Sequence, residues 1–297
     1  MSTSLRHAWL RMLAAAGVRR FVAKSGLGYQ YVCHVGDFLG ENPFYNRDAF
    51  RLELELCAAW LREEVGPTVF DVGANVGFWS THLVQMLRGQ SPQVFAFEPV
   101  VDTVVKLVHS VGRLGLGEQI EVIAAAVTCE SRPVRMSYTP RDSLFAQVEK
   151  SGLNRRVGDR LVYSASLTLD EFSDLIGRSP TLLKVDVEGS EIDVFSGAER
   201  VLSSPDRPAL LFEYNPQTLR EVGADTTQIG TLLNGYLLHY VDDFSGQLRP
   251  LGDPVASIQE IDWVCNIFAV PQEPAARDRW NAVLPAARKR LKFPDGR

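Results

Sequence analysis

The stretch VFDVGANVG at residues 69–77 constrains the fold of this chain more than any other segment. Strand-forming residues lead into Asp71, and the chain then turns between Gly73 and Gly77 into a helical segment that begins at Phe78. A glycine turn between a strand and a helix lets a ligand approach the backbone and directs amide N–H groups toward it. The pattern therefore predicts a strand–helix unit with a ligand at the turn.

Apolar strands and helices alternate regularly after this turn. We expect the elements in the order strand 68–71, helix 77–88, strand 93–97, helix 102–114 and strand 120–127, with later strands at 182–187 and 209–212. This alternation is typical of βαβ units, in which ligands bind at the carboxyl ends of parallel strands. Two further strands, 237–242 and 262–270, fit an antiparallel pair at the edge. The fold class is therefore α/β, with a mostly parallel central sheet, helices on both faces and an antiparallel C-terminal edge.

Glu98 ends the second predicted strand, directly before Pro99 and 21 residues after Gly77. In a βαβ unit, the acid that reads a ribose stands about 20 residues beyond the glycine turn. Asn75 occupies the place of the second glycine of a dinucleotide-binding motif, and Asp71 suits a cationic ligand better than a pyrophosphate. These residues favour S-adenosylmethionine, with its ammonium and sulfonium, over the competing nicotinamide cofactor.

Acidic side chains follow four of the predicted parallel strands: Asp71, Glu98, Asp186 and Glu213, with Glu188 two residues beyond Asp186. The carboxyl ends of parallel strands meet along one edge of a sheet, so we expect these groups to gather there. Carboxylates usually avoid such apolar contexts unless they are paired or bind a ligand. Their positions therefore predict a site.

With VFDVGANVGFWS, VFAFEP, LTLDEF and LLKVDVEGSEIDVFSGAERVL in this order, the chain resembles the FkbM family of S-adenosylmethionine-dependent methyltransferases over roughly residues 66–215. The resemblance implies a Rossmann-like class I methyltransferase fold and methyl transfer to hydroxyls of sugars, glycolipids, polyketides or other natural products. By the same resemblance, the cofactor would be bound by Asp71, Gly73, Ala74, Asn75 and Gly77 at its methionine end, Glu98 and Pro99 at its ribose, Ala125, Ala126 and Val127 at its adenine, and Asp186 beside the methyl group.

An alcohol acceptor must also lose its proton. Asp186 is the first candidate for the general base, followed by Glu188, Glu213 and His239. The alternative role of Asp186 and Glu188 is to hold a divalent metal that lowers the pKa of the acceptor hydroxyl, and a structural role for both also stays open. N-methylation of an amine would leave the same cofactor motifs, as would a catalytically silent domain that only binds S-adenosylmethionine.

Composition and charge set the remaining expectations. Four scattered cysteines, no signal-peptide segment and no apolar run of about 18 residues indicate a cytoplasmic chain without a transmembrane span. The net charge is −5 and residues 1–36 carry +5 with no acidic residue, so the remainder carries −10. This balance argues against nucleic acid as a partner. We expect a small-molecule acceptor such as a sugar, a lipid-linked sugar, or a polyketide or peptide natural product.

Three regions are expected. Residues 1–65 form a helical and hairpin extension that contributes to the substrate site or to a homodimer contact, 66–272 form the methyltransferase domain, and 273–297 form a basic helical tail. The basic N-terminal segment has apolar residues at helical spacing, which fits either a helix packed on the core or peripheral contact with an anionic membrane. Residues 131–165 predict an inserted strand pair or a mobile loop above the site.

Overall fold

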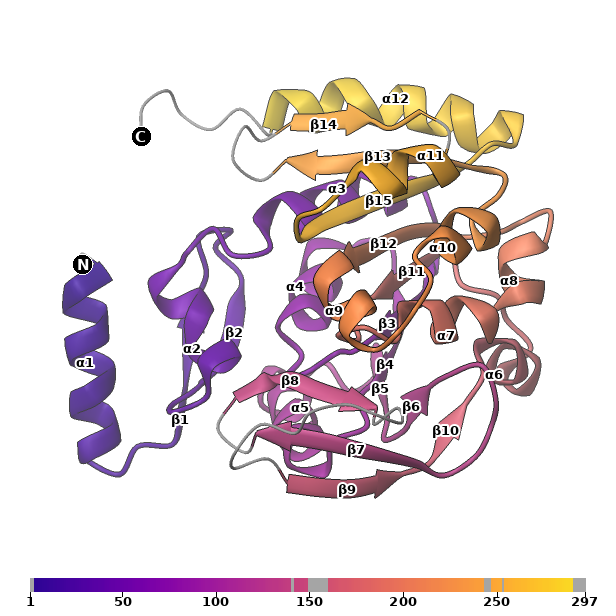
Figure 1. The fold of residues 1–297 in the computed structure, drawn as a ribbon. Helices are drawn as coiled ribbons and strands as arrows, with labels where there is room; N and C mark the ends of the chain where they lie inside the picture. The colour runs from indigo at the N-terminus through magenta and orange to yellow at the C-terminus, as the bar shows by residue number, and fades with distance from the viewer. Residues whose placement is uncertain (1–2, 140–141, 149–159, 243–246, 253, 291–297) are drawn as a thin grey trace.

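The computed structural model describes residues 3–139, 142–148, 160–242, 247–252 and 254–290. An eight-stranded sheet stands at the centre of this described part (Figure 1). Its strands are, in spatial order, β14 (Gln247–Pro250), β13 (Tyr236–Asp242), β15 (Cys265–Pro271), β12 (Ala209–Tyr214), β11 (Leu182–Val185), β3 (Thr68–Val72), β4 (Gln93–Phe97) and β5 (Ile120–Ile123).

The strands from β12 to β5 are parallel to one another, and β15, β13 and β14 are added antiparallel beyond β12. Every residue of β3 and of β11 is buried. Strands that are covered on both faces are mostly apolar. This explains why polar and apolar residues do not alternate along β3 and β11. The predicted α/β class with an antiparallel C-terminal edge is confirmed.

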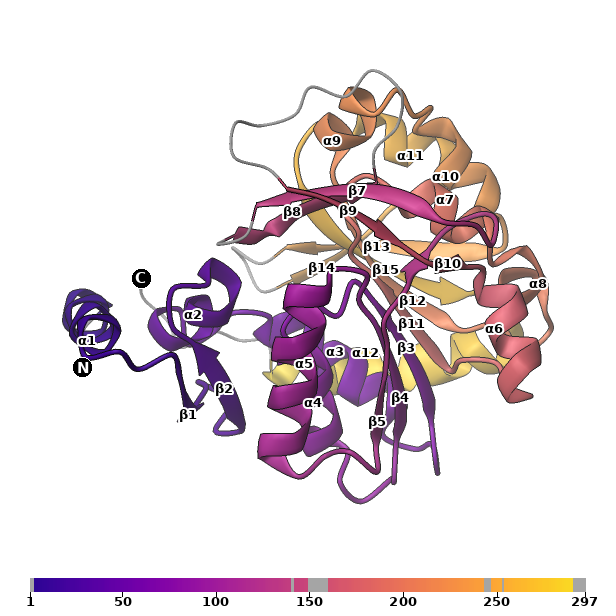
Figure 2. The same ribbon diagram turned by 90° about the horizontal axis from the view of Figure 1, so that it is seen from below.

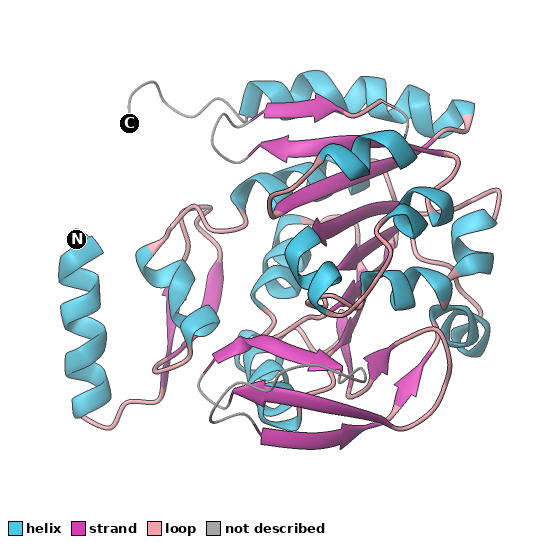
Figure 3. Ribbon diagram, viewed as in Figure 1, coloured by secondary structure: helices cyan, strands magenta, loops and turns pink. Residues whose placement is uncertain are grey.

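Helices cover both faces of the sheet (Figures 2 and 3). One hydrophobic core lies between the sheet and α3 (Arg51–Leu61), α4 (Phe78–Met86), α5 (Val101–Leu114) and α12 (Pro274–Arg290). The opposite core involves α6 (Leu169–Ile176), α7 (Glu191–Ser196), α8 (Glu199–Ser203), α9 (Pro216–Glu221), α10 (Thr227–Leu232) and α11 (Pro254–Glu260). The expected basic tail is α12 up to residue 290, and residues 291–297 lie outside the described part.

The segment between β5 and α6 differs from expectation. The strand expected at 120–127 ends at Ile123, because Ala126 donates its N–H to the carbonyl of Ala165 rather than to the central sheet. The short strand β6 (Ala126–Val127) thus pairs with β10 (Ser166–Leu167). In place of the expected strand pair or loop stands a three-stranded sheet of β8 (Asp142–Val148), β7 (Val134–Thr139) and β9 (Arg160–Ser164). Residues 140–141 and 149–159 of this segment lie outside the described part.

The N-terminal segment stands beside the sheet rather than in it (Figure 1). It consists of α1 (Thr3–Ala15), the antiparallel hairpin β1 (Arg20–Lys24) and β2 (Gln30–His34), and α2 (Phe38–Tyr45). Strand β2 of the hairpin contacts α5, and α2 contacts β8 of the inserted sheet. Among the described helices, none is both long and apolar enough to cross a membrane.

Candidate functional site

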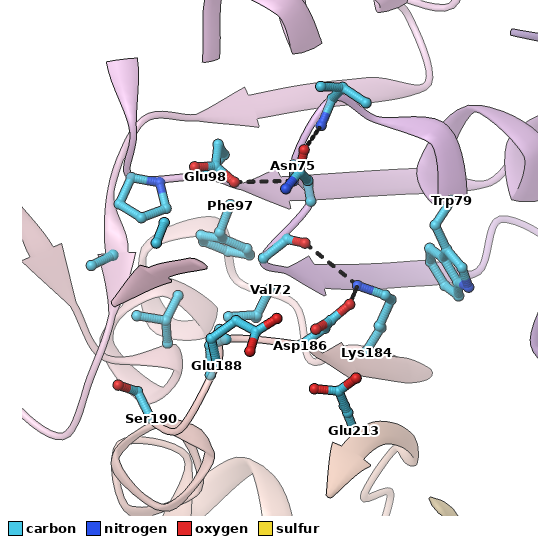
Figure 4. A pocket seen from close by; sticks show the side chains of 18 of the residues that line it. Val72, Asn75, Trp79, Phe97, Glu98, Lys184, Asp186, Glu188, Ser190 and Glu213 are labelled. Atoms are coloured by element: carbon cyan, nitrogen blue, oxygen red, sulfur yellow. Dashed lines mark hydrogen bonds and ion pairs between the residues drawn. The ribbon is translucent and has the colours of Figure 1, made fainter. Parts of the chain in front are cut away.

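A cavity of about 200 Å³ opens at the carboxyl ends of the parallel strands. The carboxyl ends of β3, β4, β11 and β12, together with the segments that follow the first three, supply its main wall. The inserted sheet and the N-terminal segment complete it. Its polar and charged side chains are Asn75, Glu98, Lys184, Asp186, Glu188, Ser190 and Glu213. Figure 4 shows Glu98 and Asn75 near one another, with Asp186, Glu188 and Glu213 on the other side of the glycine turn and Asp186 next to Lys184. The topology therefore brings the predicted acidic positions together, with one exception described below.

The glycine turn after β3 has the backbone that its sequence requires. Gly73, Asn75 and Gly77 have φ angles of 82°, 51° and 84°, values that glycine adopts readily and asparagine tolerates. The N–H groups of Gly73 and Ala74 both donate to the carbonyl of Phe97 at the end of β4, at 3.0 and 2.9 Å. The turn is thus anchored to the neighbouring strand, while its residues from Gly73 to Val76 line the cavity.

Gly73 is the position in this turn where a side chain is least tolerable. A Cβ there would overlap the carbonyl oxygen of Asp186, and we expect Gly73→Ala to lower the free energy of unfolding by about 2–4 kcal/mol through overpacking and an unfavourable φ. Gly177→Ala is the matched control, because Gly177 has φ 63° but no atom within 4 Å of its added Cβ. Urea unfolding measures both, and equal losses would contradict the role of close packing.

Two backbone N–H groups hold the Glu98 carboxylate between the glycine turn and the start of α5. Its Oε2 accepts from the Asn75 N–H at 3.0 Å and its Oε1 accepts from the Val100 N–H at 2.9 Å. Burial raises the pKa of Glu98 to about 7, although the two backbone N–H groups lower it. Each oxygen keeps a second lone pair. The group can therefore accept two further hydrogen bonds from a ligand in the cavity.

Small and apolar residues line the wall beside Glu98. Pro99 follows it directly, and Ala125, Ala126 and Val127 approach from the chain that connects β5 to β6. Phe97 and Val72 add apolar surface at the strand ends. The three residues expected beside an adenine thus line the cavity together with the expected ribose acid.

Asp71 is the exception. Its side chain is fully buried and is not part of the cavity wall. One carboxylate oxygen lies 3.1 Å from Lys184 Nζ, and the other accepts from the Ser80 hydroxyl at 2.5 Å. The motif predicts that Asp71 binds the ligand. The structure places its side chain against Lys184, beneath the glycine turn and outside the cavity wall.

Lys184 is a site residue that sequence reasoning missed. Its Nζ lies 3.4 Å from Asp186 Oδ2 and 3.5 Å from the Gly73 carbonyl oxygen, in addition to its contact with Asp71. Burial lowers the pKa of Lys184, but attraction to the Asp71 and then the Asp186 carboxylate outweighs burial, so the net pKa is raised. In the sequence, the indication of its role was a lysine within an otherwise apolar strand. In the structure, this lysine lies opposite Asp71 in the register of β11 and β3.

Three carboxylates gather at the other end of the cavity. Asp186, Glu188 and Glu213 each place an oxygen within 4.8 Å of the others. Burial raises the pKa of Glu213 to about 8, with further contributions from Asp186 and Glu191. Hard divalent cations prefer oxygen ligands of this kind, so the three residues also fit a metal of the Mg²⁺ type.

His239 is not part of this cluster. It lies in β13, three strands away from β11 in the sheet order. Its Nε2 accepts from the Trp280 indole N–H at 3.1 Å, its side chain is buried, and burial lowers its pKa. The structure thus places His239, expected as a candidate general base, away from the cavity wall, with its ring packed on Trp280 of α12.

Residues outside the parallel sheet close the cavity. Leu39 of α2 and Phe50 before α3 come from the N-terminal segment, whereas Met136, Ala146 and Val148 come from the inserted sheet. Most of this cover is apolar. It is the part of the wall that the strand-end motifs did not predict.

The family described as "Methyltransferase FkbM domain" matches residues 71–240, more than half of the chain. A hexuronic acid methyltransferase, AglP, from Haloferax volcanii is 27% identical over 190 residues, which cover 62% of this chain and 66% of that protein. The chain thus spans just under two thirds of the length of this curated relative.

Two solved structures are also similar. The FkbM methyltransferase of Methylobacillus flagellatus is 18% identical with a TM-score of 0.43, covering 68% of this chain and 43% of that chain. An S-adenosylmethionine-dependent O-methyltransferase of Thermotoga maritima is 13% identical with a TM-score of 0.39, covering 84% of this chain and 76% of that chain.

The matched region begins at Asp71 in β3, just before the glycine turn, and extends into β13. It includes β11 and β12, at whose ends the three carboxylates lie. It therefore contains Glu98, Lys184 and the three gathered carboxylates. On this match and this site, the chain belongs to the FkbM methyltransferase family.

Proposed function

We propose that this protein is an S-adenosylmethionine-dependent methyltransferase that methylates a hydroxyl group of a sugar or a sugar-bearing natural product. One observation carries the proposal: a single cavity holds a backbone-anchored carboxylate, Glu98, at one end and three clustered carboxylates at the other. The first suits a ribose and the second suits an acceptor that must lose a proton. The name of the Haloferax relative, a hexuronic acid methyltransferase, supports a sugar as the acceptor class.

The cofactor would lie along the strand ends. The backbone of Gly73, Ala74 and Asn75 would hold its methionine end, Glu98 its ribose hydroxyls, and the alanine pair at 125–126 its adenine. When bound, S-adenosylmethionine supplies an activated methyl group. Holding the acceptor in line with that group converts a bimolecular reaction into an effectively unimolecular one, a gain that reaches about 7–11 kcal/mol in well-oriented systems.

Glu213 is our candidate for the proton acceptor. Asp186 is already ion-paired with Lys184, so it is better suited to orienting the acceptor hydroxyl by accepting a hydrogen bond. Glu213 lies beside it with a pKa of about 8, near the operating pH at which a general base is most effective. Glu188 completes the same end of the cavity.

The charge of this end also bears on the choice of acceptor. Among the described residues of the cavity wall, Lys184 is the sole cation, and it contacts two carboxylates. An acceptor with a carboxylate beside its reacting group would be repelled by the carboxylates of the protein at this end of the cavity. A neutral hydroxyl or an amine would not meet this repulsion. N-methylation is the second candidate, favoured by the same three carboxylates because they would stabilise an ammonium.

Calorimetry with S-adenosylhomocysteine and NAD tests the cofactor, and binding of NAD alone would refute the proposal. Transfer of a labelled methyl group from S-adenosylmethionine tests the acceptor, with methyl glycosides of a neutral hexose, an aminohexose and a hexuronic acid as probes. Label that enters the neutral hexoside supports O-methylation. Label that enters only the amine of the aminohexoside would assign N-methylation instead.

Replacing Glu98 by glutamine is expected to weaken S-adenosylhomocysteine binding by about tenfold to a hundredfold. The loss corresponds to one charge-assisted hydrogen bond of about 1.5–3 kcal/mol. Because the ionised form accepts both ribose hydroxyls and the pKa of Glu98 is about 7, wild-type affinity should rise as the pH increases from 6 to 8. The glutamine variant should lack this rise.

The matched control for Glu98 is Glu121→Gln. Glu121 is an exposed residue of the adjacent strand β5, outside the cavity wall. Calorimetry on this variant should reproduce both the wild-type affinity and its pH dependence. Unchanged affinity in Glu98→Gln would place the ribose elsewhere.

A further inference from the structure

The N-terminal helix α1 packs on the protein along one side only. Leu10 is buried, and the Trp9 ring stacks on Phe44 at 5.4 Å and meets Phe21 edge-on at 5.0 Å. The Arg6 guanidinium donates to the Phe44 carbonyl at 2.7 Å. Figures 1 and 2 both place α1 at the outer edge of the molecule, beside α2 and the hairpin and away from the central sheet.

α1 also carries an exposed apolar strip. Leu5 and Met12 are 59% and 58% exposed, and Ala8 and Ala15 are exposed as well. Positions 5, 8, 12 and 15 follow the spacing of one helical face. Leu5 and Met12 continue the apolar face to which Trp9 belongs, yet more than half of each side chain is exposed. Packing on the protein therefore covers only part of that face.

The segment that carries α1 also presents exposed basic residues. Arg11 lies on α1, whereas Arg19, Arg20 and Lys24 lie before and in β1. None of the four forms an ion pair with another residue of the described part. Residues 1–36 carry +5 without an acidic residue, although the whole chain has a net charge of −5. A helix with an exposed apolar strip, carried by a segment of net positive charge, has the properties of helices that lie in the interface of an anionic membrane.

We propose that α1 is a membrane-docking helix, which inserts Leu5 and Met12 among the acyl chains of an anionic lipid surface while Arg11 contacts the headgroups and the positive charge of the segment attracts the surface. The segment that carries α1 also supplies Leu39 and Phe50 to the cavity wall. Docking would hold the cavity close to the lipid surface through one continuous stretch of chain. The proposal is independent of the acceptor, because it depends on α1 and on the positive charge of residues 1–36.

Co-sedimentation of the full chain with lipid vesicles tests this proposal. Vesicles of phosphatidylcholine with about one third phosphatidylserine should bind the protein at least about tenfold more tightly than vesicles of phosphatidylcholine alone, and added salt should weaken the binding. Leu5→Asp/Met12→Asp should reduce binding to the anionic vesicles at least about tenfold. Arg11→Glu should weaken it by about tenfold or more, because the change reverses one charge at the surface.

The control is Val65→Asp, which also replaces an exposed apolar side chain by aspartate, at a valine that is 92% exposed and lies outside α1. It should bind vesicles as the wild type does. Circular dichroism and thermal unfolding establish that each variant is folded. Wild-type protein that stays in solution with both vesicle types, or vesicle binding that is unaffected by the Leu5/Met12 variant, would overturn the proposal. So would a wild-type dimer that the Leu5/Met12 variant converts to a monomer in analytical ultracentrifugation, because the strip would then contact a second copy.

Discussion

Replacing Glu213 by glutamine is expected to lower the rate of methyl transfer by about 10²–10⁴-fold, the usual contribution of a positioned general base. Burial, with Asp186 and Glu191 nearby, raises the pKa of Glu213 to about 8. The ionised fraction, and with it the wild-type rate, should therefore increase about tenfold per pH unit below 8 and level off above it. Single-turnover rates between pH 6 and 9, with the acceptor found in the glycoside panel, measure both effects.

Two further variants make this prediction specific. Asp186→Asn should lower the rate but keep a rise with pH, because Asp186 orients the hydroxyl and Glu213 still takes the proton. The rise should move to lower pH, because the Asp186 charge no longer raises the pKa of Glu213. Glu118→Gln, an exposed change remote from the cavity, should have no effect. A Glu213→Gln enzyme with wild-type rate and pH profile would contradict the assignment. Activity that is lost in EDTA and restored by Mg²⁺ would instead assign the three carboxylates to a metal.

The same group also makes folding stability depend on pH. The pKa of Glu213 is about 8 in the folded protein and has an ordinary value of 4.5 when unfolded, so the folded state binds this proton more tightly. Its favourable contribution is complete below pH 4.5 and is lost as the pH rises to about 8. Glu213→Gln should thus be at least as stable as the wild type at pH 8–9, which separates a loss of rate from a loss of fold.

Replacing Lys184 by methionine is expected to lower the free energy of unfolding by about 3–5 kcal/mol, the usual cost of breaking a buried ion pair by removing one partner. Asp71 is fully buried 3.1 Å from Lys184 Nζ, so its carboxylate would lose its compensating charge and keep the Ser80 hydroxyl. Urea unfolding at neutral pH measures the effect. Because Lys184 also contacts the Gly73 carbonyl and Asp186, cofactor affinity should fall as well.

A double-mutant cycle identifies the cause of this loss. If the uncompensated charge is responsible, Asp71→Asn/Lys184→Met should be at least about 1 kcal/mol more stable than the sum of the single changes predicts. Arg200→Met is the surface control: Arg200 lies 2.7 Å from Asp174, but both side chains are more than 60% exposed. It should cost less than about 1 kcal/mol. Additive effects of the Asp71 and Lys184 changes would refute their coupling.

Local chemistry made several features predictable from the sequence. The glycine turn needs positive φ angles, and Gly73, Asn75 and Gly77 have them. The Thr168 hydroxyl accepts from the Glu171 N–H at 3.1 Å and begins α6 as a capping box, as the Thr-x-x-Glu spacing indicates. These features depend on residues close together in the chain. The parallel sheet follows from the alternation of strands and helices, because each element must bury its apolar face.

The roles of individual polar residues were less predictable, because they depend on what lies opposite each side chain. Asp71 and Glu98 both end apolar strands, yet Asp71 lies against Lys184 and Glu98 lines the cavity. His239 follows a strand pattern as well, but its ring packs on Trp280. Such distinctions require the register between strands and the placement of helices, which no short motif contains.

The sequence by itself determined the fold class, the glycine turn and the edge of the sheet where acidic residues meet, because strand period, turn chemistry and capping are local properties. Only the tertiary structure decided that Lys184 joins Asp71 to Asp186, that Glu213 lies beside Asp186, and that Leu5 and Met12 are exposed on α1. The physical reason is that pairing, burial and exposure depend on contacts between residues far apart in the chain.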